Sequence, residues 1–238
     1  MTAVQPLLSV AGIVKCYGDQ KVLDDVGFDV MPGEILGVIG PNGAGKTQLM
    51  ECVAGLLPAD AGEVCFRGAR MPASRRREAM FYLPDGIAPW SDQPVWRVTG
   101  LFRELYFLAA SHEAGIVGRL ELVPVLHKRV AELSKGYRRR LLLALALLTP
   151  QPILMLDEPF DGFDMRQTLH VMDLLREGAH ERALLLSIHQ LRDAERICDR
   201  LLLLAAGRRL GLGTLSQLAA QSGAAHADLE EVFLGITA

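Results

Sequence analysis

The fold of this chain is decided by the stretch Gly40-Pro41-Asn42-Gly43-Ala44-Gly45-Lys46-Thr47. It matches the pattern G-x-x-x-x-G-K-[ST], whose glycines let backbone N–H groups turn onto phosphate oxygens. Residues 35–39 before it are apolar and favour a strand, and residues 48–54 after it have helical spacing. This order predicts a phosphate-binding loop, because a helix N-terminus favours an anion. Lys46 would reach the β- and γ-phosphates and Thr47 would bind Mg²⁺. The alternative is a glycine-rich turn with a surface lysine.

Length and composition fit one large α/β domain, or a core with an inserted subdomain. The chain has 238 residues, half of them hydrophobic, and a net charge of −3. Since there is no global basic field, no nucleic-acid partner is expected. The arginine triplets 75–77 and 138–140 are interpreted as solvated helix faces. The four cysteines are far apart, which predicts reduced thiols in the cytosol rather than disulfides or a zinc site.

No targeting or membrane-spanning segment is expected. Residues 1–6 lack a charged start and a long apolar run, so they do not resemble a signal peptide. The most apolar run, residues 141–156, is interrupted by Pro150 and Pro152. Neither part reaches the roughly 18 apolar residues that a span needs. The chain is expected to be soluble unless a partner holds it at a membrane.

Apolar runs and turn residues predict alternating strands and helices along much of the chain. The expected strands are residues 7–17, 21–30, 35–39, 79–83, 153–157, 183–188 and 200–205, with a hairpin arm at 62–68. Helices are expected at 165–178 and 190–197. Such alternation favours a mostly parallel sheet with helices on both faces.

Composition changes in residues 85–149, which are richer in Leu, Ala, Arg and Glu and therefore predict a helical insertion. The expected division is a core with the phosphate-binding loop, residues 1–84 and 150–213, a helical subdomain of 85–149 and a helical tail of 214–238. The predicted fold class is an α/β P-loop NTPase with a mostly parallel sheet flanked by helices. The predicted fold also contains an N-terminal antiparallel β part and the helical subdomain.

Two carboxylates follow the apolar run 153–156, namely Asp157 and Glu158. A buried strand that ends on two carboxylates is what a phosphate-binding loop requires for hydrolysis. Asp157 would bind Mg²⁺ through a water, because Mg²⁺ keeps part of its hydration shell. Glu158 would orient or deprotonate the attacking water. An ordinary acidic turn at a strand end is the alternative.

A second anion-binding helix start is expected at residues 133–137, Leu-Ser-Lys-Gly-Tyr, which open the apolar helix 138–148. Ser134 is a suitable N-cap. A helix N-terminus that carries serine and glycine is suited to bind phosphate.

The phosphate loop, L-S-x-G at a helix start, the Asp-Glu strand end and a histidine after strand 183–188 together resemble the nucleotide-binding subunit of ABC transporters. The similarity covers residues 7–215. It implies that Tyr17 stacks on adenine and that His189 contacts the γ-phosphate, although a lone histidine is more often structural. The ATP-binding residues that it implies are Tyr17, Gly40, Pro41, Asn42, Gly43, Ala44, Gly45, Lys46, Thr47 and Gln48.

The same resemblance implies a head-to-tail dimer of two such subunits. Ser134, Lys135 and Gly136 would then contact the phosphate of ATP held by the opposite subunit. The loop Asp161-Gly162-Phe163-Asp164 would link the two sites, through Asp161 and Asp164.

Two departures from the family pattern stand out. Lys135 and Tyr137 occupy positions where the family motif has Gly and Gln, and Asp85 stands where the family has a glutamine. Asp85 is assigned to catalysis and, with Thr47 and Asp157, to the metal; Gln93 is a weaker candidate. These departures, and the closing residues 229–234, resemble the branch that drives ABC-2-type exporters.

The function implied is an ATP hydrolase that powers a separate integral membrane permease, with ATP and Mg²⁺ as cofactors. Its partners would be the permease and a second ATP-binding subunit, either another copy or a paralogue. It would lie in the cytoplasm, peripheral on the inner membrane face. Residues 85–149 would contact the permease through a groove near Trp90, Trp96 and Phe102, unless these aromatics are core. The alternatives are a soluble ABC-type ATPase acting on ribosomes or DNA, and a weakly active ATP-binding regulatory module.

Overall fold

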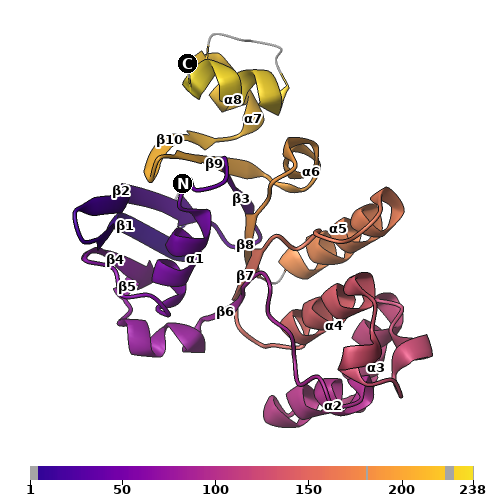
Figure 1. Ribbon diagram of the computed structural model, residues 1–238. Coiled ribbons are helices and arrows are strands. Elements are labelled where there is room, and N and C mark those ends of the chain that lie inside the picture. The colour runs from indigo at the N-terminus through magenta and orange to yellow at the C-terminus, as the bar shows by residue number, and fades with distance from the viewer. Residues whose placement is uncertain (1–4, 181, 223–227, 238) are drawn as a thin grey trace.

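The structure is a computed structural model that describes residues 5–180, 182–222 and 228–237. Its strands form two sheets (Figure 1). The N-terminal sheet is antiparallel and has the order β2-β1-β4-β5, with bounds Gln20–Val30, Leu8–Tyr17, Ala61–Phe66 and Ala69–Arg70. Leu8 and Val10 of β1 are buried because alternate residues of a strand face the same side, and a register shift between Val10 and Ile13 brings Ile13 to that side as well. This sheet is the antiparallel part that the sequence predicted.

The central sheet has six strands in the order β10-β9-β3-β8-β7-β6. Their bounds are Arg208–Gly213, Arg200–Ala205, Ile35–Ile39, Ala183–Ser187, Ile153–Asp157 and Met80–Leu83. All neighbours pair in parallel except β10, which is antiparallel to β9. Every residue of β3, β7 and β8 is buried, as expected for parallel strands covered on both faces.

Eight α-helices accompany the sheets in the described part of the chain. Their bounds are α1 Lys46–Ala54, α2 Val95–Leu105, α3 Ala110–Arg119, α4 Lys135–Leu147, α5 Met165–Ala179, α6 Leu191–Ile197, α7 Leu215–Ser222 and α8 Leu229–Thr237. Short 3-10 helices lie at Ala73–Glu78, Val123–Val125 and Val130–Glu132. None of the helices described is long and apolar enough to cross a membrane.

The central sheet separates two hydrophobic cores. Leu36 and Val38 of β3 face a core shared with the antiparallel sheet and α1, whereas Ile35 and Ile39 face the opposite core. That second core continues from the sheet into α2, α4 and α5. The helices α2, α3 and α4 lie together between β6 and β7 in the chain, away from the antiparallel sheet (Figure 1). The division into core, helical subdomain and tail stays a prediction.

Two expectations about side chains can be compared directly with the structure. All four cysteines are free thiols, as predicted. The interpretation of the arginine triplets as solvated faces fits the exposed Arg75, Arg77 and Arg138. It is wrong for Arg139, which is only 6% exposed, and for Arg76, which donates to the carbonyl of Cys52 at 2.6 Å. Both arginines face a neighbouring element, where a carboxylate or a helix-terminal carbonyl compensates the charge.

Candidate active site

The phosphate loop connects β3 to α1 and is shaped by glycines. Gly43 and Gly45 have φ values of 79° and 100°, a region that side chains rarely adopt. A Cβ at Gly40 would lie 2.1 Å from the carbonyl oxygen of Leu204, so this position admits only glycine. The loop backbone can therefore curl closely around a ligand at the start of α1.

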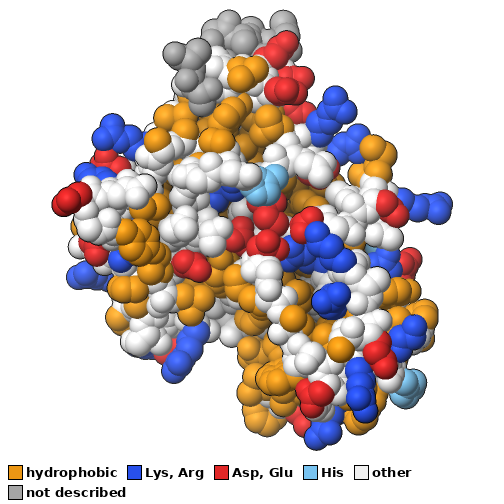
Figure 2. Space-filling model, in the orientation of Figure 1, with side chains coloured by type: hydrophobic (Ala, Val, Ile, Leu, Met, Phe, Trp, Pro, Cys, Tyr) orange, Lys and Arg blue, Asp and Glu red, His pale blue; other side chains and the backbone are white. Residues whose placement is uncertain are grey.

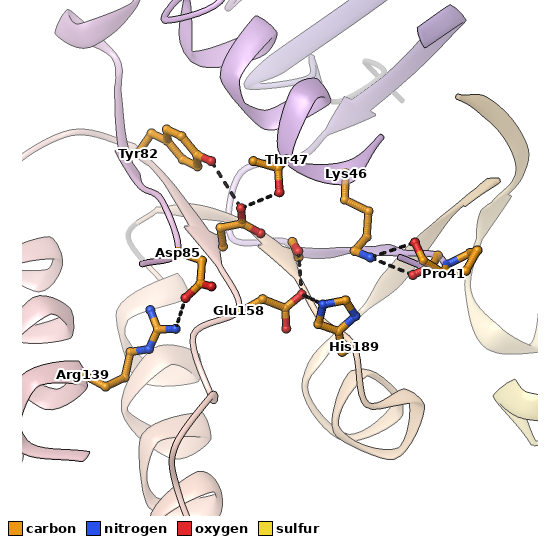
Figure 3. Close-up of polar contacts among 11 residues, drawn as sticks. Pro41, Lys46, Thr47, Tyr82, Asp85, Arg139, Glu158 and His189 are labelled. Atoms are coloured by element: carbon orange, nitrogen blue, oxygen red, sulfur yellow. Dashed lines mark hydrogen bonds and ion pairs between the residues drawn. The ribbon is translucent and has the colours of Figure 1, made fainter. Parts of the chain in front are cut away.

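Lys46 lies over this loop. Its Nζ donates to the carbonyl of Gly40 at 2.7 Å and to that of Pro41 at 3.3 Å (Figure 3). Burial lowers the pKa of Lys46, and the charges of Glu158 and Asp157 partly oppose that shift. The buried ammonium is satisfied by backbone carbonyls, which an anionic ligand could replace.

Asp157, at the end of β7, forms a cluster of oxygen atoms with Thr47. The Thr47 hydroxyl donates to Asp157 Oδ2 at 2.9 Å, and the Tyr82 hydroxyl lies 3.4 Å from the same oxygen (Figure 3). Asp157 is 2% exposed, and burial raises the pKa of Tyr82, which keeps the phenol protonated as a donor. Hydroxyl and carboxylate oxygens are the ligands that Mg²⁺ prefers.

Glu158 is placed by an unusual backbone conformation. Its φ is 50°, and its Oε1 accepts a hydrogen bond of 3.0 Å from the Ser187 hydroxyl and lies 3.1 Å from His189 Nε2. Burial raises the pKa of Glu158 to about 7, although the Ser187 hydrogen bond opposes the shift. Burial lowers the pKa of His189. A carboxyl group with a pKa near neutrality is suited to accept and release a proton.

These groups meet in one cavity of about 250 Å³, lined by residues 42–48, Asp85, Asp157, Glu158 and His189. In Figure 3, Lys46 and Thr47 extend from the start of α1 and Glu158 from the position after β7. The carboxyl ends of parallel strands meet at one sheet edge, which explains why these distant residues converge.

Asp85 lies at the rim of the cavity, on the loop after β6. It is paired with Arg139 of α4, whose Nη2 lies 2.6 Å from Asp85 Oδ1 (Figure 3). The weaker candidate Gln93 donates to Asp92 and lines a different cavity.

Other predicted residues lie outside this cavity. Tyr17, at the end of β1, is 52% exposed, and Lys15 Nζ lies 5.4 Å from its ring centroid. Ser134, Lys135 and Gly136 form the start of α4, where Ser134 is the N-cap and accepts from the Tyr137 amide at 3.3 Å. An exposed tyrosine and a capped helix start are both accessible to a ligand that enters from outside the chain.

The loop 161–164 makes two contacts of its own. Asp161 pairs with Lys135 at 2.8 Å, which lowers the pKa of Asp161. Asp164 is the N-cap of α5, because its Oδ1 accepts from the Gln167 amide at 2.9 Å. The roles of both aspartates between two sites stay predictions.

Two residues of this site, Tyr82 and Ser187, were missed by the sequence reasoning. Ser187 pairs directly with Asp157 in the β7–β8 register, and β6, which carries Tyr82, pairs with β7 on its other side. The available signal was a polar residue inside an apolar strand, but only the strand order shows which carboxylate it meets.

A comparison with known protein families shows to which family this chain belongs. The family model described as ABC transporter matches residues 23–161, more than half of the chain. The chain belongs to the ABC transporter family. The predicted fold class is likewise confirmed by solved ABC ATP-binding cassettes.

Related sequences of the ABC family extend over most of the chain. An uncharacterized ABC transporter ATP-binding protein of Methanocaldococcus jannaschii is 31% identical over 90% of this chain and 80% of its own length. The Nod factor export ATP-binding protein I of Rhizobium meliloti is 36% identical over 87% of this chain and 64% of its own length. The chain therefore spans somewhat less than two thirds of that second relative.

Solved ABC structures agree with this assignment. An ATP-binding subunit of an ABC transporter superposes with a TM-score of 0.89 at 29% identity, over 98% of this chain and all of that one. A bacterial Atm1-family ABC exporter with ATP bound has a TM-score of 0.83 at 20% identity, over 43% of its chain, and shows the shared fold alone. This ABC protein is an ATP-binding ATPase subunit of a transporter, which confirms the prediction and does not favour either alternative.

Proposed function

We propose that this ABC ATPase binds MgATP between two subunits and uses its hydrolysis to drive export through a separate membrane permease. The observation that carries the proposal is the cavity itself. It combines the phosphate loop with a carboxylate of near-neutral pKa, whereas the second predicted phosphate contact, at the start of α4, lies outside it. One chain thus offers an incomplete site that a second chain would complete.

The residues of the cavity fit a magnesium ion together with the phosphates of ATP. Thr47 Oγ1 and Asp157 Oδ2 lie 2.9 Å apart, so both oxygens can face one cation, directly or through water. A bound Mg²⁺ would neutralise charge on the phosphates. Lys46 would exchange its bonds to Gly40 and Pro41 for phosphate oxygens, which the curled backbone allows to approach.

Glu158 is proposed to accept the proton of the attacking water. Ser187 and His189 hold Oε1 of Glu158, so the carboxylate has a fixed orientation before ATP arrives. Burial lowers the pKa of His189, and a neutral imidazole has a single N–H, so contact with the γ-phosphate would take that N–H away from Glu158 Oε1. In this division of roles, Asp85 at the rim of the cavity would accept a hydrogen bond from a metal-bound water.

The expected pH dependence of ATP turnover follows from the pKa of Glu158. Because its pKa is raised to about 7, protonation below that value removes the base, and turnover should rise through pH 7 and level off above it. The measurement is the rate at saturating MgATP between about pH 5.5 and about 9, with ATP affinity determined over the same range. A rate that falls as pH rises through 7 would contradict the assignment.

The second subunit is proposed to bring Ser134, Lys135 and Gly136 to the ATP of the first, as another copy or a paralogue. A carboxylate placed at Gly136 would repel the triphosphate there, yet a Cβ has space, since its nearest neighbour is the Gly162 carbonyl at 3.6 Å. We expect Gly136→Asp to abolish ATP-dependent dimerisation while monomer ATP binding persists.

Light scattering with and without MgATP measures this effect, in a background in which Glu158→Gln slows hydrolysis. Gly118→Asp is the matched control, since Gly118 lies on α3 and a Cβ built there would meet nothing within 4 Å. Equal ATP-dependent dimerisation of the Gly136 and Gly118 variants would rule out the proposed interface.

The contact with the permease is proposed for the outer surface of α2 and the loop before it. Trp90 and Trp96 are 55% and 50% exposed and line a cavity of about 580 Å³. Figure 2 shows hydrophobic side chains gathered over this lower part of the molecule. Phe102 does not line this cavity: it is half-buried and packs edge-on against Phe81, which favours the alternative that it belongs to the core.

Export and a place on the inner face of the membrane are inferred from relatives named for export. The proposal is tested by purifying the chain from membranes and measuring ATP hydrolysis alone and with the co-purified integral membrane protein. We expect ATP hydrolysis to increase when that membrane protein is present. The Trp96→Glu variant is expected to no longer co-purify with it. A Trp96→Glu chain that retains the partner at full yield would remove α2 from the interface.

A further inference from the structure

Two cations on one face of α4 hold the two loops that border the active site. Lys135 and Arg139 are four residues apart and so lie one above the other on the helix. Lys135 pairs with Asp161, after β7, and Arg139 pairs with Asp85, after β6. The two ion pairs differ in burial, since Lys135 is 68% exposed at its side chain and Arg139 only 6%.

We infer that Arg139 is a positioning residue for ATP hydrolysis: it anchors Asp85 at the cavity and ties that loop to the helix that begins with Ser134. The inference rests on the proposed function and names a residue that neither the motifs nor the family resemblance assigned.

The loop that carries Asp85 has little other support. Residues 85–88 are all exposed, and a Cβ built at Gly86 would meet nothing within 4 Å. Arg139 in contrast is only 6% exposed, so its guanidinium has a defined position. A buried, planar donor can therefore fix the Asp85 carboxylate even though Asp85 is half-exposed.

Charge balance gives Arg139 a second role. The cavity has three carboxylates, those of Asp85, Asp157 and Glu158, against the single lysine Lys46. Arg139 compensates the charge of Asp85 through Oδ1, and Oδ2 makes no hydrogen bond within the described residues. The free oxygen is the one available to a metal-bound water, while the ion pair limits repulsion of the triphosphate.

The position of Arg139 links the two halves of the proposed composite site. Ser134 caps the helix that carries Arg139 just over one turn further on, and Asp85 lies beside the phosphate loop. A shift of α4 when a second subunit binds at Ser134 would move Asp85 with it. Since misplacement by about 1 Å can reduce turnover about 100-fold, this connection would make hydrolysis sensitive to dimer formation.

The test compares Arg139→Gln with Arg140→Gln in the full chain. Arg140 is the matched control: it follows directly on α4, has an 11% exposed side chain and pairs with Glu121, away from the cavity. We expect Arg139→Gln to lower kcat by about 10- to 100-fold, and Arg140→Gln to leave it within about twofold, despite similar losses in Tm. The second readout is the Mg²⁺ concentration that gives half-maximal binding of a fluorescent ATP analogue, which should change only in Arg139→Gln.

Two further variants separate positioning from folding. Arg139→Lys keeps the charge and should retain most of the rate, and Arg139→Gln should have little further effect when added to Asp85→Asn. The inference is overturned if Arg139→Gln and Arg140→Gln lower kcat equally. It is also overturned if the fold-reductions in kcat caused by Arg139→Gln and Asp85→Asn multiply in the double variant. Failure of the proposed function looks different, because the unmodified chain would then lack Mg²⁺-dependent ATP binding.

Discussion

Glu158→Gln is expected to abolish ATP turnover while leaving ATP affinity nearly unchanged. The amide keeps the shape of the side chain but cannot accept a proton, and a general base contributes about 10²- to 10⁴-fold to the rate. Bound ATP would then persist, so the variant should accumulate as an ATP-bound dimer. Single-turnover hydrolysis and light scattering in the presence of MgATP measure the two effects separately.

The matched control for this variant is Glu177→Gln. Glu177 is a glutamate on α5 whose side chain is 63% exposed and pairs with Arg119 outside the active-site cavity. The Glu177→Gln variant should hydrolyse ATP at the same rate as the unmodified chain. Hydrolysis by Glu158→Gln at that same rate would show that another group activates the water, despite the contacts of Glu158 with Ser187 and His189.

Lys46→Ala is the second variant with a large expected effect, and it acts on binding. Hydrogen bonds to charged groups contribute about 1.5–3 kcal/mol, which corresponds to about 10- to 100-fold in ATP affinity. Without ATP the cost should be smaller, because the lost contacts are two bonds to the carbonyls of Gly40 and Pro41. The measurement is the ATP-induced rise in Tm, which depends on ligand concentration relative to Kd.

Lys21→Ala serves as the control for the removal of a lysine. Lys21 is half-exposed and pairs with Asp24 at 2.7 Å in the antiparallel sheet, so its loss should leave the ATP-induced rise in Tm intact. Unaltered ATP affinity in Lys46→Ala would contradict the phosphate loop as the binding element. Together with Glu158→Gln, the variant separates loss of binding from loss of the chemical step.

Elements defined by local pattern could be predicted closely. Strands β7 and β9 have the predicted bounds, because short apolar runs between turn residues can be recognised without knowledge of their neighbours. Helix α4 begins at Lys135, directly after the predicted N-cap Ser134, whereas the apolar run was predicted to start only at residue 138. The cap, and not the hydrophobic period, therefore marks the boundary of this helix.

Residues of the candidate site could be predicted where they belong to a sequence motif. They could not be predicted where two contacting side chains come from different strands or helices. Asp157 and Glu158 follow from their place after an apolar run. Ser187, Tyr82 and Arg139 became site residues only when strand order and helix packing brought them to these carboxylates.

The sequence by itself determined the phosphate loop, the two carboxylates after β7 and the alternation of strands and helices, because each depends on residues that are close together in the chain. Only the tertiary structure decided that Ser187 would hold Glu158, that Lys135 would meet Asp161 and that a buried Arg139 would hold Asp85. These contacts join residues between 26 and 54 positions apart, and their geometry depends on the strand register and the position of α4 against the sheet.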